Sequence, residues 1–269
     1  MLAPKKQAQI GIIGGSGFYS LLSDSSPIKV ETPFGPPSDK VALGKIAGKK
    51  VAFLSRHGRT HDFPPHKINY RANIWALKSL GVERIITVTA CGSLQRRIKP
   101  GDFVILDQFV DRTRGREDTF YDGPLSTHVS LAYPYCRQIA KIVYRQGRRL
   151  KLRIHPTGTM VVIQGPRFST AAESEFFTKM GWEVVNMTSY PEVVLARELE
   201  ICYGAIAICT DWDAGLVVQK RVKPVTANEI VKVFKNNVVL AKKLIKQIIK
   251  NLPDKRECVC SEALKGARL

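Results

Sequence analysis

The sequence lacks any long hydrophobic run. No stretch of the 269 residues approaches the roughly 18 consecutive apolar residues that a membrane-spanning helix needs. The opening residues, MLAPKKQAQ, also lack the apolar segment of a secretory signal peptide. We therefore expect a cytoplasmic protein without a membrane partner.

Internal repeats, low-complexity linkers and abrupt changes of composition are absent as well. With 44% apolar residues, the chain can bury a core of ordinary size. Its length permits one large domain or two small ones, and no change of composition marks a boundary. We therefore expect a single domain spanning residues 1–269, in which residues 252–269 form a peripheral C-terminal tail containing a Cys-x-Cys motif.

Acidic residues are scarce relative to basic ones. The chain has 23 Asp and Glu against 42 Lys and Arg, which gives a formal net charge of +19. Such an excess can indicate a nucleic-acid partner, but the basic residues are scattered, with one local run at 145–153. Neither an RNA-binding aromatic signature nor zinc-finger spacing accompanies them. A solvated basic surface that attracts anionic substrates explains the charge without a nucleic-acid partner.

Six cysteines occur in a chain without an export signal. Intracellular thiols are normally reduced, although hyperthermophilic organisms are an exception. Cys258 and Cys260 form a Cys-Val-Cys motif in the polar tail, without the histidine or further cysteine nearby that would indicate a zinc site. Two interpretations stay open at this point: disulfide bonds, or free thiols.

Short β-rich segments alternate with helical ones. Apolar runs typical of buried strands occupy residues 9–15, 40–46, 49–55, 84–93, 102–111, 159–165, 182–188 and 203–211. Amphipathic or helix-favouring segments occupy 69–81, 133–148, 171–181, 191–200 and 226–251. Segments rich in glycine, proline and polar residues predict loops at 16–40, 56–68 and 112–132. This alternation predicts an α/β fold, in which the long loops carry the functional site.

Polar residues gather directly after the predicted strands, where open α/β sheets bind their ligands. The segments concerned are GGSG (14–17), SRHGR (55–59), TACGS (89–93), QGPRFST (164–170), VNMTS (185–189) and CTDWD (209–213). Ser16, Arg56, Thr89 and Thr188 offer hydroxyls and a fixed positive charge suited to an anion. Two carboxylates instead end the last strand. This division predicts a ligand with phosphate at one end and hydrogen-bond donors, such as an exocyclic amine, at the other.

Each of these features has a simpler interpretation. The glycines at 14–17 are compatible with a dinucleotide-binding turn, but Ser20 stands where the third glycine is required. His57, His61 and His66 lack the helical spacing of a metal site, so we expect no metal. Asp211 and Asp213 could cap a helix, and Phe168 could belong to the core. Each feature alone is therefore weak evidence for a functional site, and the features become specific only when they are considered together.

Taken together, eight segments resemble the S-methyl-5′-thioadenosine phosphorylases of the trimeric purine nucleoside phosphorylase family. They are IGIIGGSGFY, SRHGRTHDFPPHKINYRANIWALKSLG, TACGSL, GDFVILDQFVDRT, FYDG, GPRFST, NMTSYPEVVLA and ICTDWD, in consistent order over roughly residues 9–250. The resemblance implies a single α/β domain with a central mixed, twisted sheet flanked by helices. It also implies phosphorolysis, in which inorganic phosphate attacks C1′ of a nucleoside and releases the purine. Phosphate is then a co-substrate, no cofactor is needed, and the assembly is a homotrimer or a hexamer of two trimers.

The resemblance carries site residues over to this chain. By similarity, phosphate would be held by Ser16, Arg56, His57, Thr89, Ala90 through its backbone, and Thr188. The nucleoside would contact Phe168, Ser169, Asn186, Met187, Asp211, Trp212, Asp213, Ala227, Ile230 and Val231. His128 matches a position that completes the pocket of a neighbouring subunit. Among these, Asp211 would act as general acid on the departing base, and Asp213 would raise its pKa through like-charge proximity.

Substrate choice follows from the same comparison. Relatives that use 6-oxopurines carry Glu at the position of Ser169 and Asn at that of Asp211, so the sequence favours adenine. Ala227, Ile230 and Val231 offer an apolar wall suited to a 5′-methylthio group. Trp212 replaces the usual tyrosine, Gln164 replaces a frequent Glu, and residues 214–225 diverge. A broader or 6-oxopurine nucleoside phosphorylase acting on adenosine, inosine or guanosine is therefore the alternative.

The resemblance also sorts the cysteines. It places Cys91 and Cys209 in strands of the site, where we expect reduced thiols. Cys136–Cys202 and Cys258–Cys260 are then the candidate disulfide pairs.

Overall fold

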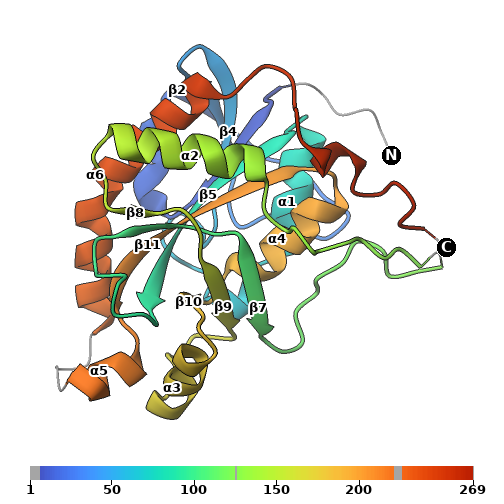
Figure 1. Cartoon of the computed structure of the whole chain (residues 1–269). Coiled ribbons are helices and arrows are strands. Elements are labelled where there is room, and N and C mark those ends of the chain that lie inside the picture. Colours follow the sequence, from blue (N-terminus) through green and yellow to red (C-terminus); the bar gives the residue numbers. More distant parts are fainter. Residues whose placement is uncertain (1–6, 125, 221–225, 269) are drawn as a thin grey trace.

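A computed structural model describes residues 7–124, 126–220 and 226–268 and contains an eleven-stranded mixed sheet (Figure 1). Its strands are β1 (Ile10–Gly14), β2 (Ser23–Ile28), β3 (Val41–Ile46), β4 (Lys49–Ser55), β5 (Arg84–Ser93), β6 (Phe103–Ile105), β7 (Gln108–Arg112), β8 (Ile154–His155), β9 (Thr159–Ile163), β10 (Val184–Asn186) and β11 (Cys202–Trp212). Its helices are α1 (Tyr70–Ser79), α2 (Arg137–Arg149), α3 (Ala171–Lys179), α4 (Ser189–Glu198), α5 (Ala214–Lys220) and α6 (Ala227–Asn251). Short 3₁₀ helices occupy Ser16–Leu21, Pro65–Lys67 and Val259–Glu262. The expected single α/β domain with a mixed central sheet is confirmed.

The sheet is built around β5. The main path runs β2-β3-β4-β1-β5-β10-β9-β7, and β11 pairs with both β5 and β6. β1 is parallel to β4 and β5, β11 is parallel to β5, and β10 is antiparallel to β5. Every residue of β1 and the first nine of β11 are buried, as expected of strands covered on both faces.

Helices cover both faces of this sheet (Figure 1). One apolar core contains Ile74 and Leu77 of α1 together with Val193 and Leu195 of α4. The other contains apolar residues of α2 and α6, among them Ile139 and Ile245. No helix in the described ranges is long and apolar enough to cross a membrane.

The long C-terminal helix begins where its sequence predicts. Thr226 caps α6 by accepting a hydrogen bond from the Glu229 backbone, and the Glu229 carboxylate accepts one from the Thr226 backbone. This reciprocal pair satisfies two backbone donors that the first helical turn leaves free. The three-to-four-residue apolar spacing then buries Ala241, Ile245 and Ile248 against the sheet.

Two sequence-based boundaries are wrong. The segment 16–40 is not all loop, because it contains a 3₁₀ helix and the edge strand β2, which pairs antiparallel with β3. An edge position tolerates Pro27, which has no N–H to donate to a ladder. The run at 102–111 divides into two strands with different partners, since β6 pairs with β11 and β8, whereas β7 pairs with β9.

The C-terminal tail folds back onto the domain. Cys260 is buried in the same core as α2 and α6, and the Ala267 carbonyl accepts a hydrogen bond of 2.7 Å from the His128 backbone. A β-bridge between Thr127 and Arg268 continues this contact. The tail therefore supports the loop that carries His128.

Four cysteines, two of them from this tail, meet where it packs against the domain. The Sγ atoms of Cys136, Cys202, Cys258 and Cys260 all lie within 4.8 Å of one another. The Cys202 and Cys258 sulfurs are 3.3 Å apart, and all six cysteines are free thiols. The two expected disulfides are therefore not formed among the described residues, and the four sulfurs form one cluster in place of two separate pairs.

Candidate active site

A cavity of about 480 Å³ opens at the carboxyl ends of the central strands. It is bounded by the residues that follow β1 and β4, by residues 88–92 within β5, by β10 and β11, and by the N-terminal half of α6. In Figure 1, α3 and α5 lie together at this lower end of the sheet. The location agrees with the general rule for ligand sites in open α/β sheets.

Most of the residues expected from the sequence line this one cavity. Those expected to hold phosphate are Arg56, His57, Thr89, Ala90 and Thr188. Those expected to contact the nucleoside are Phe168, Ser169, Asn186, Met187, Asp211, Asp213, Ala227, Ile230 and Val231. The topology thus brings together six segments that are far apart in the sequence.

Three expected residues are placed differently. The side chain of Ser16 lies outside the described part of the structure, although Gly15 and Gly17 on either side of it line the cavity. Trp212 is half-buried at the end of β11 and does not line the cavity. His128 is exposed on its loop and does not line the cavity of its own chain.

Arg56 is held rigidly at the anion end. Its guanidinium is 3% exposed and donates from Nε to Glu192 Oε1 at 2.5 Å and from Nη2 to Glu192 Oε2 at 3.0 Å. Further bonds run from Nη2 to the Thr87 hydroxyl and from Nη1 to the Val88 carbonyl. Burial alone would lower the pKa of Arg56, but the Glu192 carboxylate outweighs it and raises that pKa.

His57, beside Arg56, is neutral near pH 7. Burial lowers its pKa to about 4, and the positive charge of Arg56 acts in the same direction. Its Nδ1 lies 2.8 Å from the Phe63 carbonyl oxygen, which can only accept, so Nδ1 is the donor. Nε2 is then left as an acceptor, suited to a protonated phosphate oxygen. His61, which the sequence did not single out for the site, stacks on His57 with ring centroids 4.3 Å apart.

A network of hydroxyls and one amide continues the anion end. Asn186 donates from Nδ2 to Thr89 Oγ1 at 3.2 Å and to Ser189 Oγ at 2.8 Å. Its Oδ1 accepts from the Thr188 backbone, and the Thr89 and Thr188 hydroxyl oxygens are 3.4 Å apart. Asn186 therefore holds two phosphate-binding candidates at a fixed separation.

The opposite end of the cavity is acidic. In the pairing of β11 with β5, Cys209 faces Cys91 and Asp211 faces Gly92, so Thr210 is an extra residue in a bulge. Such a bulge redirects the side chains that follow it, and bulges are frequent beside active sites. Burial raises the pKa of Asp211 to about 7, with a smaller contribution from Asp213, against the Thr210 hydroxyl, which donates to Asp211 Oδ1 at 2.6 Å.

Asp213 ends the same strand and precedes α5. Burial raises its pKa, although the nearby hydroxyls of Ser174 and Ser169 and the Ala214 backbone N–H act in the opposite direction. Within the described residues, Asp213 Oδ2 and both serine hydroxyls are buried without a partner in hydrogen-bonding geometry. Unpaired buried polar groups are costly, so Asp213 and Ser169, which line the cavity, are suited to the donors and acceptors of a bound base, whereas Ser174 does not line it.

An apolar wall closes the third side of the cavity. It comes from α6, where Ala227, Ile230, Val231, Phe234 and Val238 follow one another at helical spacing. Phe234 and Val238 are not among the site residues expected from the sequence. Their spacing from Ile230, at i+4 and i+8, was the signal that could have placed them in the site.

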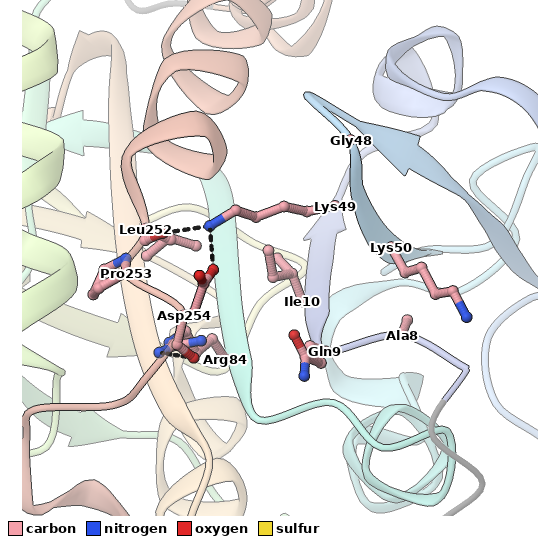
Figure 2. A pocket seen from close by; sticks show the side chains of 10 residues that line it. All are labelled: Ala8, Gln9, Ile10, Gly48, Lys49, Lys50, Arg84, Leu252, Pro253 and Asp254. Carbon is pink, nitrogen blue, oxygen red and sulfur yellow. Dashed lines mark hydrogen bonds and ion pairs between the residues drawn. The ribbon is translucent and has the colours of Figure 1, made fainter.

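A second cavity of about 380 Å³ lies at the amino ends of β1, β4 and β5 (Figure 2). Lys49 donates there to the Leu252 carbonyl, at the end of α6, and lies 3.4 Å from Asp254. Arg84 donates to the Asp254 carbonyl at 3.4 Å. These basic groups thus anchor the start of the tail, and none of the site residues expected from the sequence lines this cavity.

The four-cysteine cluster is the one group of potential metal ligands within the described ranges, and none of its members lines the main cavity.

The fold is of the α/β class, and the main cavity combines anion donors, a pair of carboxyl groups and an apolar wall. This combination is the one expected of a nucleoside-binding transferase. The chain belongs to the phosphorylase superfamily, whose family model matches residues 9–250. It is 49% identical over 264 residues to the S-methyl-5′-thioadenosine phosphorylase of Thermofilum pendens, covering 97% of this chain and 99% of that one. It is also 45% identical to a purine nucleoside phosphorylase of Streptomyces coelicolor, with 98% and 97% covered. Among solved structures, methylthioadenosine phosphorylase from Schistosoma mansoni in complex with adenine matches with a TM-score of 0.89, at 37% identity and 97% coverage of each chain. The expected family is thereby confirmed.

Proposed function

We propose that the protein cleaves S-methyl-5′-thioadenosine with inorganic phosphate, giving adenine and 5-methylthioribose 1-phosphate. The observation that carries this proposal is the cavity itself, which places a carboxyl group with a pKa of about 7 opposite a cluster of anion donors. A relative supports the same reaction, since a mutant of the adenosine/methylthioadenosine phosphorylase from Schistosoma mansoni has been solved in complex with methylthioadenosine, at 36% identity and a TM-score of 0.88.

The reaction needs a nucleophile on one face of C1′ and an acid beyond the base. Phosphate bound by Arg56, Thr89 and Thr188 attacks C1′ as the bond from C1′ to N9 breaks. The sugar passes through an oxocarbenium-like state, which the negative charge of phosphate stabilises. The electron pair of the broken bond moves onto the purine, and Asp211 donates a proton to N7.

Asp213 and Ser169 select the base. A carboxylate at Asp213 can only accept, which suits the 6-amino group of adenine and disfavours a 6-carbonyl group. The unpaired hydroxyl of Ser169 lies near Asp213 and can complete the contact with the base. Phe168, which lines the cavity and is 49% exposed, offers a face for stacking on the purine.

The alternative function is a nucleoside phosphorylase of broader base or 5′ specificity. It is favoured by the Streptomyces coelicolor relative, which carries that name. The apolar residues of α6 argue for a methylthio group at the 5′ end, because an unpaired 5′-hydroxyl buried against them would lose its hydrogen bonds to water.

Phosphorus NMR during incubation with methylthioadenosine and phosphate tests the reaction type. We expect one new resonance from a sugar 1-phosphate, growing in step with free adenine. Adenine release without this resonance would mean hydrolysis and would reject phosphorolysis.

We further propose that the protein works in the cytoplasm as a homotrimer or as a hexamer of two trimers. His128 supports this, because it is exposed on a loop tied to the tail and does not line its own cavity, as expected of a residue that completes a neighbour's pocket. Light scattering after gel filtration should give three or six times the 30.0 kDa chain mass. A monomer with full activity would reject the assigned role of His128.

Finally, we propose that Cys136–Cys202 and Cys258–Cys260 close as disulfides, four thiols losing four electrons and four protons to a disulfide oxidant by exchange. The close approach of all four sulfurs supports this. Thiol titration in denaturant should find two reactive cysteines before reduction and six afterwards. Six free thiols before reduction, with or without bound zinc, would contradict the pairing.

A further inference from the structure

A buried carboxylate lies behind the anion end of the cavity without lining it. Glu192 of α4 is 0% exposed and follows the cavity residue Thr188 by four positions. Its Oε1 and Oε2 accept the two bonds from Arg56 described above, and Oε2 also accepts from the Tyr203 hydroxyl at 2.6 Å. A charged group in such a position is retained only when it is fully paired.

These contacts determine which N–H groups of Arg56 remain available to a ligand. A guanidinium has five N–H groups. Four of them are engaged within the protein: Nε–H with Glu192, both Nη2 hydrogens with Glu192 and Thr87, and one Nη1 hydrogen with the Val88 carbonyl. One N–H, on Nη1, has no partner within the part of the chain that the structure describes, and Arg56 lines the cavity.

The position of that N–H depends on Glu192 more than on any other partner. The Nε and Nη2 pair forms a bidentate contact with the carboxylate, which sets both the place and the plane of the guanidinium. Thr87 is itself anchored, since its hydroxyl donates to the Ile13 carbonyl at 3.1 Å. Tyr203 holds the carboxylate in turn, so a chain of buried contacts runs from β11 through α4 to the cavity.

We propose that Glu192 is a positioning residue for inorganic phosphate, which it serves by holding Arg56 so that a single Nη1 hydrogen faces the phosphate. This proposal rests on the proposed function for the identity of the anion. Glu192 touches neither substrate. Its loss therefore changes phosphate binding without changing the binding of the nucleoside.

The test compares Glu192→Gln with a matched control on the same helix. Glu198 is likewise buried, but its oxygens accept from Thr119 Oγ1 and the Phe120 backbone, both at 2.7 Å, and it does not line the cavity. Glu198→Gln therefore removes a buried carboxylate of α4 while leaving Arg56 untouched. Melting temperatures of both variants establish that the proteins compared are folded.

The primary readout is calorimetric titration of each protein with inorganic phosphate. Loss of one charge-assisted bond to Arg56 should weaken phosphate binding in Glu192→Gln by about 10- to 100-fold. KM for phosphate should rise by a similar factor, while KM for methylthioadenosine stays within about twofold. Glu198→Gln should leave phosphate binding within about twofold of the wild type.

Two results would overturn the proposal. Unchanged or tighter phosphate binding in folded Glu192→Gln would mean that Glu192 does not position Arg56. Equal losses of phosphate and nucleoside affinity, matched by Glu198→Gln, would mean a purely structural role.

If Glu192→Gln does not fold, Tyr203→Phe replaces it, since it removes only the hydroxyl bond to Glu192. That variant should raise KM for phosphate about threefold without affecting KM for methylthioadenosine, and no rise would overturn the proposal. Because the titration needs no nucleoside, a wild type that binds phosphate but does not cleave methylthioadenosine would refute the proposed function alone.

Discussion

The pH dependence of turnover follows from the environment of Asp211. Burial raises its pKa from 3.8 to about 7, so the carboxyl group is ~90% protonated at pH 6 and ~10% at pH 8. A general acid is active only in its protonated form. We therefore expect kcat for methylthioadenosine to be constant below pH 6 and to fall about tenfold per pH unit above pH 8. The pKa of His57 is lowered to about 4, so this histidine contributes no step in that range.

Two substitutions should shift the pH at which kcat falls, the descending limb of the pH profile, in opposite directions. The Thr210 hydroxyl donates to Asp211 and lowers its pKa, so Thr210→Val should shift the limb to higher pH by up to about one unit. The charge of Asp213 raises the pKa of Asp211, so Asp213→Asn should shift the limb to lower pH.

The assay is chromatographic measurement of adenine release between pH 5 and 9 at saturating phosphate and nucleoside. Comparing each variant with the wild type under identical conditions removes the contribution of phosphate ionisation. Limbs that coincide in all three proteins would refute the assignment of Asp211 as the acid.

Three further predictions concern the same cavity. Asp211→Asn should lower kcat on methylthioadenosine about 10²- to 10⁴-fold while phosphate affinity, measured by calorimetry, stays unchanged; wild-type turnover would reject the general acid. Gly92→Ala should weaken adenine binding, because a Cβ there would lie 3.3 Å from Val185 Cγ1, closer than ordinary contact, and would add a methyl group to the cavity lining beside Asp211; equal Kd values by calorimetry would show that the cavity accommodates the methyl group. Ile230→Ser should reduce the preference for methylthioadenosine over adenosine about tenfold in kcat/KM, and an unchanged ratio would place the 5′ group elsewhere.

The sequence could predict the strands of the site because each strand is indicated by residues that are adjacent in the sequence. The segments 49–55 and 84–93, which are rich in apolar residues, have the same bounds in the structure as in the prediction. The carboxyl ends of parallel strands necessarily meet at one edge, which explains why Arg56, Thr89 and Asp211 line the same cavity. The resemblance to known phosphorylases then supplied the roles that spacing alone does not give.

What could not be predicted depends on contacts between distant segments. Edge strand β2 is rich in serine and contains Pro27, so its composition indicates a loop, and only its pairing with β3 makes it a strand. Glu192 lies in α4, more than 130 residues after Arg56, and no local pattern relates the two residues. The four cysteines come from the start of α2, the start of β11 and the tail, so their convergence is a property of the tertiary fold.

Release of free base from methylthioadenosine, adenosine and inosine, measured side by side with and without phosphate, tests the assigned function most directly. We predict phosphate-dependent release that is fastest from methylthioadenosine and slowest from inosine, because Asp213 accepts from a 6-amino group and α6 presents an apolar wall. Release of similar rate from inosine, or release that does not depend on phosphate, would contradict the assignment of the two ends of the cavity.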